Sequence, residues 1–214
     1  MNRWMTVAGW AAVVACLAAA VAGGMRLDGY SHALHPLALL GGRGVPGAAA
    51  FNLFGFVVPG VLAALVSWGL YRALPAAAGW WPRIGARLLL VSALAFAAQG
   101  LLPLDPQDLE GPESGLHASA WMVWWTAFAA GALLSATGAR RTRIATIAAA
   151  CVVMAMMLVP ASVLTPVLAQ RIAFAAWLLW LALVPRAASA VAELERQDHG
   201  GQGESGDVGQ DHRP

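Results

Sequence analysis

The run MTVAGWAAVVACLAAAVAGGM (residues 5–25) decides the fold, because it has no charged residue and is long enough for a helix that crosses a lipid bilayer. Crossing the hydrocarbon core takes about 20 mostly apolar residues in a helix. The whole chain has the same character. Of its 214 residues 59% are hydrophobic and 11% are charged, whereas a soluble domain carries about 25% charged residues. The sequence therefore predicts an integral membrane protein.

Six runs of the sequence have this length or come close to it. They cover residues 5–25, 50–72, 84–104, 117–138, 143–160 and 167–186. Helices are expected because the runs lack the alternation of apolar and polar residues that barrel strands show. We therefore predict an all-α, polytopic membrane protein in which residues 1–186 form one domain of six transmembrane helices. The Gly-rich, polar residues 187–214 are predicted to form a disordered cytoplasmic tail.

Arginine is unevenly distributed between the two ends of the predicted helices. If all six cross the bilayer, most arginines fall on one side: Arg3, Arg72, Arg83, Arg87, Arg140, Arg141, Arg143 and Arg186. The other side receives the remaining loop arginines and the loop acids: Arg26, Arg43, Arg171, Asp28, Asp105, Asp108, Glu110 and Glu113. Because short cytoplasmic loops retain positive charge, both termini are predicted to be cytoplasmic.

The composition also bears on the source and on the first run. The basic residues are all arginine, and alanine and glycine are frequent, which is typical of a GC-rich bacterial gene. We therefore expect a bacterial inner membrane. An alternative for residues 1–24 is a cleaved signal peptide, since AVAGG (residues 20–24) offers small residues like those at a cleavage site. The apolar run is longer than a usual signal core, which favours a retained helix.

The stretch DGYSHALHPLALLGGRGVPG (residues 28–47) joins the first two runs. It is too short and too polar to span a bilayer, yet too apolar for a free aqueous loop. We predict a short extracytoplasmic amphipathic or re-entrant segment. Its Gly-rich end lacks the Lys and the Ser or Thr of a phosphate-binding loop, so no nucleotide is expected there. No nucleic acid is expected as a partner.

Polar residues gather at the outer ends of the predicted helices. They are Ser31, His32, His35, Asn52, Gln99, Asp105, His117, Gln170 and Arg171. Polar side chains at membrane depth are costly unless they meet one another, line a cavity or reach the interface. We therefore expect them to converge on one extracytoplasmic pocket. The candidate ligand-binding residues are Ser31, His32, Asn52, Gln99 and Arg171.

Three interpretations of this pocket stay open. In a hydrolase or transferase, His35 or His117 would be the base and Asp105 would orient it or act as the acid, with Ser31 as nucleophile in a covalent variant. In a metal site, the ligands would be His32, His35, His117 and Asp105, because imidazole and carboxylate suit zinc. In the third, the same groups hold loops to helix ends by hydrogen bonds. The cofactor is left open, with His35 and His117 the candidates for haem.

Two stretches carry a resemblance to a known family: SHALHPLALLGGRGVPGAAAFNLFGFVVPG (residues 31–60) and GLLPLDPQDLEGPESGLHASAW (residues 100–121). They resemble the bacterial domain-of-unknown-function 998 membrane proteins, over residues 5–185. The resemblance implies six helices and the family positions Asn52, Gly100, Pro103, Asp105 and His117. The plan is also similar to that of a eukaryotic group associated with lipid handling, which implies a membrane lipid as partner. The alternatives are a non-catalytic sensor, transporter or scaffold, and a metal-dependent intramembrane hydrolase.

Overall fold

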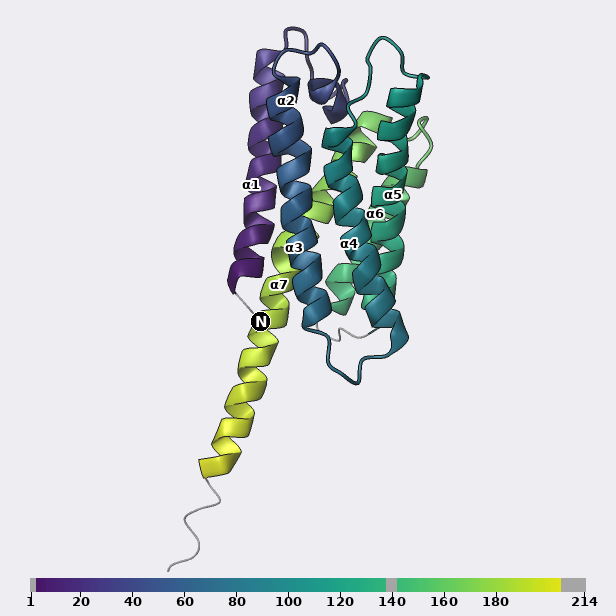
Figure 1. Cartoon of the computed structure of the whole chain (residues 1–214). Helices are drawn as coiled ribbons and strands as arrows, with labels where there is room; N and C mark the ends of the chain where they lie inside the picture. Colours follow the sequence, from purple (N-terminus) through teal and green to yellow (C-terminus); the bar gives the residue numbers. More distant parts are fainter. Residues whose placement is uncertain (1–2, 138–141, 205–214) are drawn as a thin grey trace, which may run out of the picture.

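The long helices of the chain lie side by side in one bundle and run alternately in opposite directions (Figure 1). The computed structural model describes residues 3–137 and 142–204, with side chains up to residue 185. The helices are α1 (Arg3–Arg26), α2 (Ala48–Phe51), α3 (Val58–Arg72), α4 (Trp80–Leu101), α5 (Pro112–Ser135), α6 (Arg143–Leu158) and α7 (Pro166–Glu204). Two short segments complete them, the 3-10 helix η1 (Leu37–Gly41) and the π-helix η2 (Asn52–Val57). These described residues form no strand, so the all-α prediction is confirmed.

The helices have the length and composition of membrane-spanning segments, as predicted. Among the described residues, five are long and apolar enough to cross a bilayer: Arg3–Arg26, Ala48–Arg72, Trp80–Leu101, Pro112–Ser135 and Pro166–Pro185. The chain is therefore a multi-pass membrane protein. α6 is apolar but has 16 residues, which span about 24 Å at about 1.5 Å per residue, less than the hydrocarbon thickness of about 30 Å.

The last helix extends beyond the sixth apolar run, residues 167–186. α7 continues as helix to Glu204 and extends past the end of the bundle at which α1 begins (Figure 1). The sequence AASAVAELE (residues 187–195) explains the continuation, because alanine, leucine and glutamate are strong helix formers. The rest of the predicted tail, residues 205–214, and the predicted loop arginines Arg140 and Arg141 lie outside the described residues.

Small residues let the helices approach closely. A Cβ added to Gly60 of α3 would lie 2.5 Å from the Ala97 nitrogen of α4, and one added to Gly131 of α5 would lie 2.9 Å from the Gly85 oxygen of α4. Gly9 of α1 likewise lies against the Leu181 carbonyl of α7. Close backbone packing of this kind replaces the hydrophobic driving force that helices lack inside lipid.

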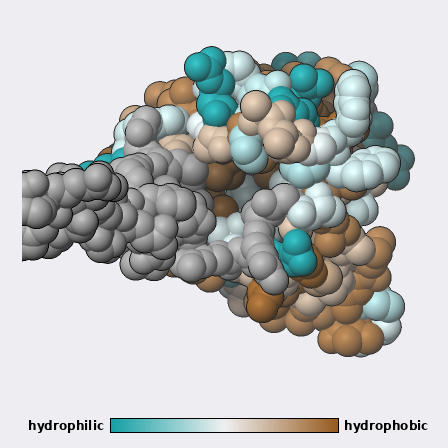
Figure 2. Space-filling view, turned by 90° about the horizontal axis from the view of Figure 1, so that it is seen from below, coloured by the Kyte–Doolittle hydropathy of each residue, from teal (hydrophilic) through white to brown (hydrophobic). Residues whose placement is uncertain are grey.

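An aromatic cluster fills the centre of the bundle. The rings of Phe96 and Trp177 lie 4.4 Å apart, and those of Trp124 and Phe174 lie 5.0 Å apart. All four side chains are buried. Viewed from the end at which α1 begins, brown hydrophobic surface lies around the rim of the bundle (Figure 2). Apolar residues thus occupy both the core and the flank, as expected of a protein whose flank meets lipid.

The second spanning helix changes its winding near its first residues, beside the end of α1. Residues 48–72 form one continuous helical segment made of α2, η2 and α3. Pro59 has no N–H to donate to the Gly55 carbonyl, and the wider π turns lie just before it. η2 lies against α4, because a Cβ added to Gly100 would lie 2.6 Å from the Asn52 carbonyl oxygen.

Candidate functional site

The polar residues singled out in the sequence lie at the end of the bundle at which α1 ends and α7 begins (Figure 1). They do not form one cluster. The structure distributes them over separate sets of contacts, each of which joins a loop or a short helix to a neighbouring helix. A groove between α1 and the α2–η2 segment is a further feature of this end, and sequence reasoning missed it.

The first set joins the α1–η1 loop to α7. An Arg171 Nη atom donates to the Tyr30 hydroxyl at 3.0 Å and to the His35 carbonyl oxygen at 2.9 Å. His35 Nδ1 accepts a hydrogen bond from the Ser31 backbone N–H at 3.0 Å. The ring of His32 packs edge-on against Tyr30, with the centroids 5.0 Å apart. Partial burial and the positive charge of Arg171 lower the pKa of His32 below its usual 6.5.

The second set joins η1 to η2. Asn52 Nδ2 donates to the Gly41 carbonyl oxygen at 2.8 Å, and a Cβ on Gly41 would collide with the same side chain. Leu37 and Leu40 of η1 are buried. The segment after α1 is therefore a short apolar helix held against the bundle by an amide hydrogen bond, and Asn52 is used within the fold.

The third set closes the end of α4. His117 Nδ1 lies 3.2 Å from the Gln99 carbonyl oxygen and 2.9 Å from the Leu102 carbonyl oxygen. Since both partners are acceptors, Nδ1 carries the proton. In a continuing helix these carbonyls would accept from residues 103 and 106, which are both proline and have no N–H. His117 thus supplies the donor that two prolines remove.

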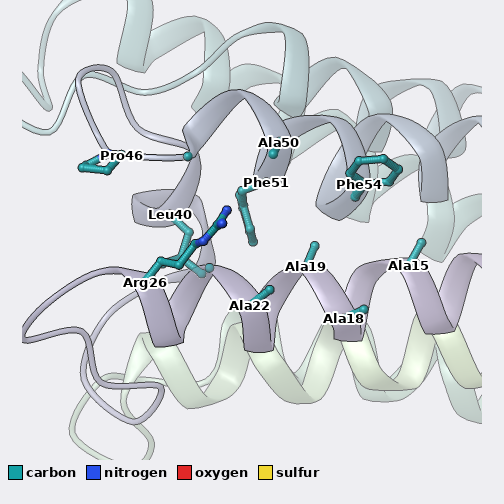
Figure 3. Close-up of a pocket in the computed structure, with 12 residues that line it drawn as sticks. Ala15, Ala18, Ala19, Ala22, Arg26, Leu40, Pro46, Ala50, Phe51 and Phe54 are labelled. Atoms are coloured by element: carbon teal, nitrogen blue, oxygen red, sulfur yellow. The ribbon is translucent and has the colours of Figure 1, made fainter.

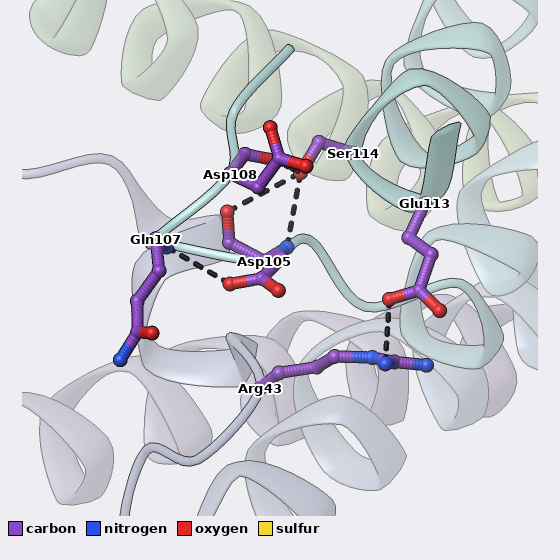
Figure 4. A network of polar contacts seen from close by, with 6 residues as sticks. All are labelled: Arg43, Asp105, Gln107, Asp108, Glu113 and Ser114. Carbon is purple, nitrogen blue, oxygen red and sulfur yellow. Dashed lines mark hydrogen bonds and ion pairs between the residues drawn. The ribbon is translucent and has the colours of Figure 1, made fainter. Parts of the chain in front are cut away.

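The loop between α4 and α5 has its own polar network (Figure 4). Asp105 Oδ1 accepts from the Gln107 N–H at 2.9 Å, which closes an Asx turn, and the Asp105 N–H donates to Ser114 Oγ at 3.0 Å. Arg43 and Glu113 form an ion pair with 2.7 Å between the charged atoms. The Arg43 N–H also donates to the Leu104 carbonyl oxygen at 2.9 Å. The network holds the loop after η1 against the α4–α5 loop.

These sets of contacts determine whether the candidate residues can act together in one catalytic or metal site. Among the described residues, no three His, Cys, Asp or Glu side chains are grouped so that they could hold one metal ion. The candidate ligands His32, His35, His117 and Asp105 are thus not brought together. His35, Asp105 and His117 each bond to backbone groups of the loop or helix end beside them.

Some buried polar atoms near the aromatic cluster have no hydrogen-bond partner in the described part of the chain. They are Gln99 Nε2, Trp124 Nε1, Gln170 Oε1 and Arg171 Nε. Gln99 is 1% exposed and Trp124 is fully buried. Such atoms cost free energy when they are left unpaired in a low-dielectric interior. Gln99, Gln170 and Arg171 belong to the predicted site, but these atoms take no part in the hydrogen bonds described above.

The groove lies between the second half of α1, from Ala15 to Arg26, and the α2–η2 segment (Figure 3). It has a volume of about 250 Å³. One wall is made by small side chains of α1, and the other by residues of the second spanning helix. The lining residues are Ala15, Ala18, Ala19, Ala22, Gly23, Arg26, Leu40, Pro46, Gly47, Ala50, Phe51 and Phe54.

The shape of the groove follows from residue size and spacing. Ala15, Ala18, Ala19 and Ala22 are spaced i, i+3, i+4 and i+7, so they lie on one face of α1 and leave room beside it. The spacing of these alanines is the sequence signal that could have indicated the groove.

The groove is open to the outside of the bundle. Ala18, Ala22, Ala50 and Phe54 are exposed, whereas Phe51 and Leu40 are buried and form its floor. Only 28% of the most apolar window of α1 is buried inside the protein, against 50% for α4. The open side of the groove is therefore part of the apolar flank of the bundle.

Arg26 lies at one end of the groove and its side chain reaches across it toward Phe51 (Figure 3). The two other arginines at this end of the bundle are engaged: Arg43 with Glu113, and Arg171 with Tyr30 and the His35 carbonyl. Within the described residues, Arg26 makes no hydrogen bond or ion pair, and Asp28 does not pair with it. The groove thus combines an apolar trough with a free positive charge.

A comparison with family models assigns the chain. The model described as "Protein of unknown function (DUF998)" matches residues 10–187, which is most of the sequence. The chain belongs to the DUF998 family. The resemblance seen in the sequence is thereby confirmed. No curated protein and no solved structure matches the chain.

The positions that carry the DUF998 resemblance have identifiable packing roles. Asn52 and Gly100 let η1, η2 and α4 approach one another, Pro103 ends α4, and His117 satisfies the carbonyls left there. Asp105 stabilises the turn that follows. The DUF998 motifs therefore describe how the end of the bundle at which α1 ends is built, and the groove lies beside them.

Proposed function

We propose that this DUF998 protein binds a membrane lipid, and that the groove between α1 and the α2–η2 segment holds one of its acyl chains. The observation that supports this function is the groove itself: an apolar trough on the flank of a multi-pass membrane protein, where the adjacent solvent is lipid. A trough lined by alanine and phenylalanine suits a hydrocarbon chain and offers it no polar group along its walls.

The membrane arrangement that we propose has six spans. α6 is the sixth, because it packs beside α5 and α7 and no charged residue falls between Arg143 and Arg171. The end that carries Arg3, Arg72 and Arg83 would face the cytoplasm of a bacterial cell, together with both termini. η1 would then be an extracytoplasmic segment, buried against the outer ends of the helices.

The lipid occupant can be tested by counting the lipids that the purified protein retains. The full-length protein is reconstituted into nanodiscs, released in the gas phase and weighed by native mass spectrometry. The wild type should retain one lipid. Ala18→Trp should reduce the retained lipid about tenfold, because an indole would occupy the trough. Ala11→Trp is the matched control: Ala11 is an exposed alanine of α1 outside the groove, so this variant should retain lipid as the wild type does.

Two results would contradict the proposal. Equal lipid retention by the wild type and Ala18→Trp, with both folded, would mean that no chain occupies the trough. A dimer that Ala18→Trp dissociates, with no lipid retained by either form, would identify a second copy of the chain as the occupant. Thermal unfolding of each variant shows whether it is folded.

A further inference from the structure

We infer that the groove selects an anionic phospholipid, with the acyl chain between α1 and the α2–η2 segment and the phosphate-bearing headgroup on Arg26. This inference rests on the proposed function and adds the headgroup class to it. It depends on the charge at the mouth of the groove and on the length of the trough.

The positive charge of Arg26 indicates an anionic ligand. Arg26 is the arginine at this end of the bundle that has no partner among the described residues. A guanidinium is always protonated near neutral pH and presents N–H donors in a planar fork that matches a phosphate. Arg26 reaches across the mouth of an apolar groove, so a ligand that satisfies both must have a hydrocarbon part and a negatively charged part (Figure 3).

The trough is about as long as one leaflet of the bilayer is thick. From Ala15 to Arg26 the helix rises about 16 Å at about 1.5 Å per residue. One leaflet of the hydrocarbon core is about 15 Å thick, half of about 30 Å. A chain whose end lies near Ala15 therefore has its headgroup at the depth of Arg26, the last residue of α1. A water-soluble phosphate would use Arg26 but would leave the apolar trough unfilled.

The other arginines at this end have their own partners, which leaves the Arg26 guanidinium available for a ligand. Arg43 is neutralised by Glu113, and both of these side chains are partly exposed, at 55% and 42%. Arg171 donates to Tyr30 and to a backbone carbonyl, and it lies in the set that joins the loop to α7. Removing the Arg26 charge should therefore change headgroup preference without disturbing the contacts that hold the outer loops.

The test measures headgroup preference in nanodiscs that contain equal amounts of phosphatidylglycerol and phosphatidylcholine. The wild type should retain phosphatidylglycerol over phosphatidylcholine by about fivefold, the effect of one basic residue near a headgroup. Arg26→Gln should retain one lipid with nearly no preference, and Arg26→Lys should keep part of it. Arg72→Gln is the matched control, because it removes the same charge at the opposite end of the bundle, from an exposed residue that has no side-chain partner among the described residues.

Each other outcome overturns a specific statement. One retained lipid without preference in the wild type, or an unchanged preference in Arg26→Gln, overturns the headgroup inference and leaves the acyl-chain proposal standing. Equal losses in Arg26→Gln and Arg72→Gln also overturn it, because the effect would then be one of net charge. No retained lipid in the wild type overturns both. The wild-type preference should also fall as salt is raised, a result that needs no variant; a salt-independent preference contradicts a contact with an exposed arginine.

Discussion

Two neighbouring helix pairs of the bundle are joined in different ways. α4 and α5 make the most extensive contact in the structure, with glycines facing each other and with Ser92 Oγ donating to the Trp124 carbonyl oxygen at 2.8 Å. α1 and the α2–η2 segment leave a groove between their side chains along the half of α1 that ends at Arg26, and the described residues form no side-chain hydrogen bond across it. α4 and α5 are thus held together by backbone contact and a hydrogen bond, whereas the alanines of α1 leave a groove beside the α2–η2 segment.

The difference shows how small residues can have opposite effects in a membrane bundle. Where glycine faces glycine, the backbones meet and the space between the helices disappears, as at Gly85 and Gly131. Where a row of alanines faces a larger residue such as Phe54, a groove remains between the side chains, although α1 contacts Phe51 at Gly23. The first arrangement stabilises the bundle, and the second leaves surface for a lipid.

The largest effect should come from enlarging a glycine between α4 and α5. Gly131→Leu should lower the free energy of unfolding by about 2–3 kcal/mol, because its Cβ would already lie 2.9 Å from the Gly85 oxygen and the Leu89 nitrogen. Gly115→Leu on the same helix is the control, since a Cβ there meets nothing within 4 Å. Thermal unfolding in detergent measures both. A Gly131→Leu variant as stable as Gly115→Leu would show that α4 and α5 are not in backbone contact.

A smaller loss of stability is expected from removing the His117 donor at the end of α4. His117→Phe keeps a ring but leaves the Gln99 and Leu102 carbonyls without the Nδ1 proton, which should cost about 1–3 kcal/mol. Ser119→Ala removes a hydroxyl that bonds within its own helix and should change stability by about 0.5 kcal/mol or less. If His117→Phe proves as stable as Ser119→Ala in the same unfolding assay, the prolines at the end of α4 need no substitute donor.

The smallest expected effect is a dependence of stability on pH that arises from His32, in the loop that follows α1. Because the pKa of His32 is lowered in the folded protein, the unfolded chain binds this proton more readily, and stability should fall as the pH drops through about 6.5. His32→Asn should make the fall shallower between about pH 8 and pH 5, as followed by the unfolding temperature. An equal or steeper fall in His32→Asn would contradict the lowered pKa.

The fold could be predicted from the sequence because lipid imposes a simple rule, that every long apolar run becomes a helix. That rule placed α1, α4 and α5 to within a few residues. The rule does not set the end of α7, where helix propensity continues the element beyond the apolar run. It also could not indicate the π turns before Pro59, which depend on how one helix adjusts to a missing donor.

The contacts of the candidate site residues were harder to predict, because the sequence shows that a side chain is polar but not which group it bonds to. His117, Asn52 and Asp105 lie at the end of the bundle at which α1 ends, and their partners there are backbone atoms, which carry no sequence signal. The sequence does not mark Arg26 as a binding residue, because a single arginine after an apolar run is an ordinary helix end. Its importance appears only when the partners of Arg43 and Arg171 are known.

The buried aromatic cluster gives this protein an optical signature. Trp124 lies 5.0 Å from Trp121 and 5.8 Å from Trp177, measured between ring centroids, in fixed tilted or edge-on orientations. Indoles held this closely in an asymmetric setting should give a strong near-ultraviolet circular dichroism signal, which disappears when specific packing is lost while helices remain. Because the three rings come from α5 and α7, that signal would report separation of these helices specifically, while the far-ultraviolet signal reports the helices themselves.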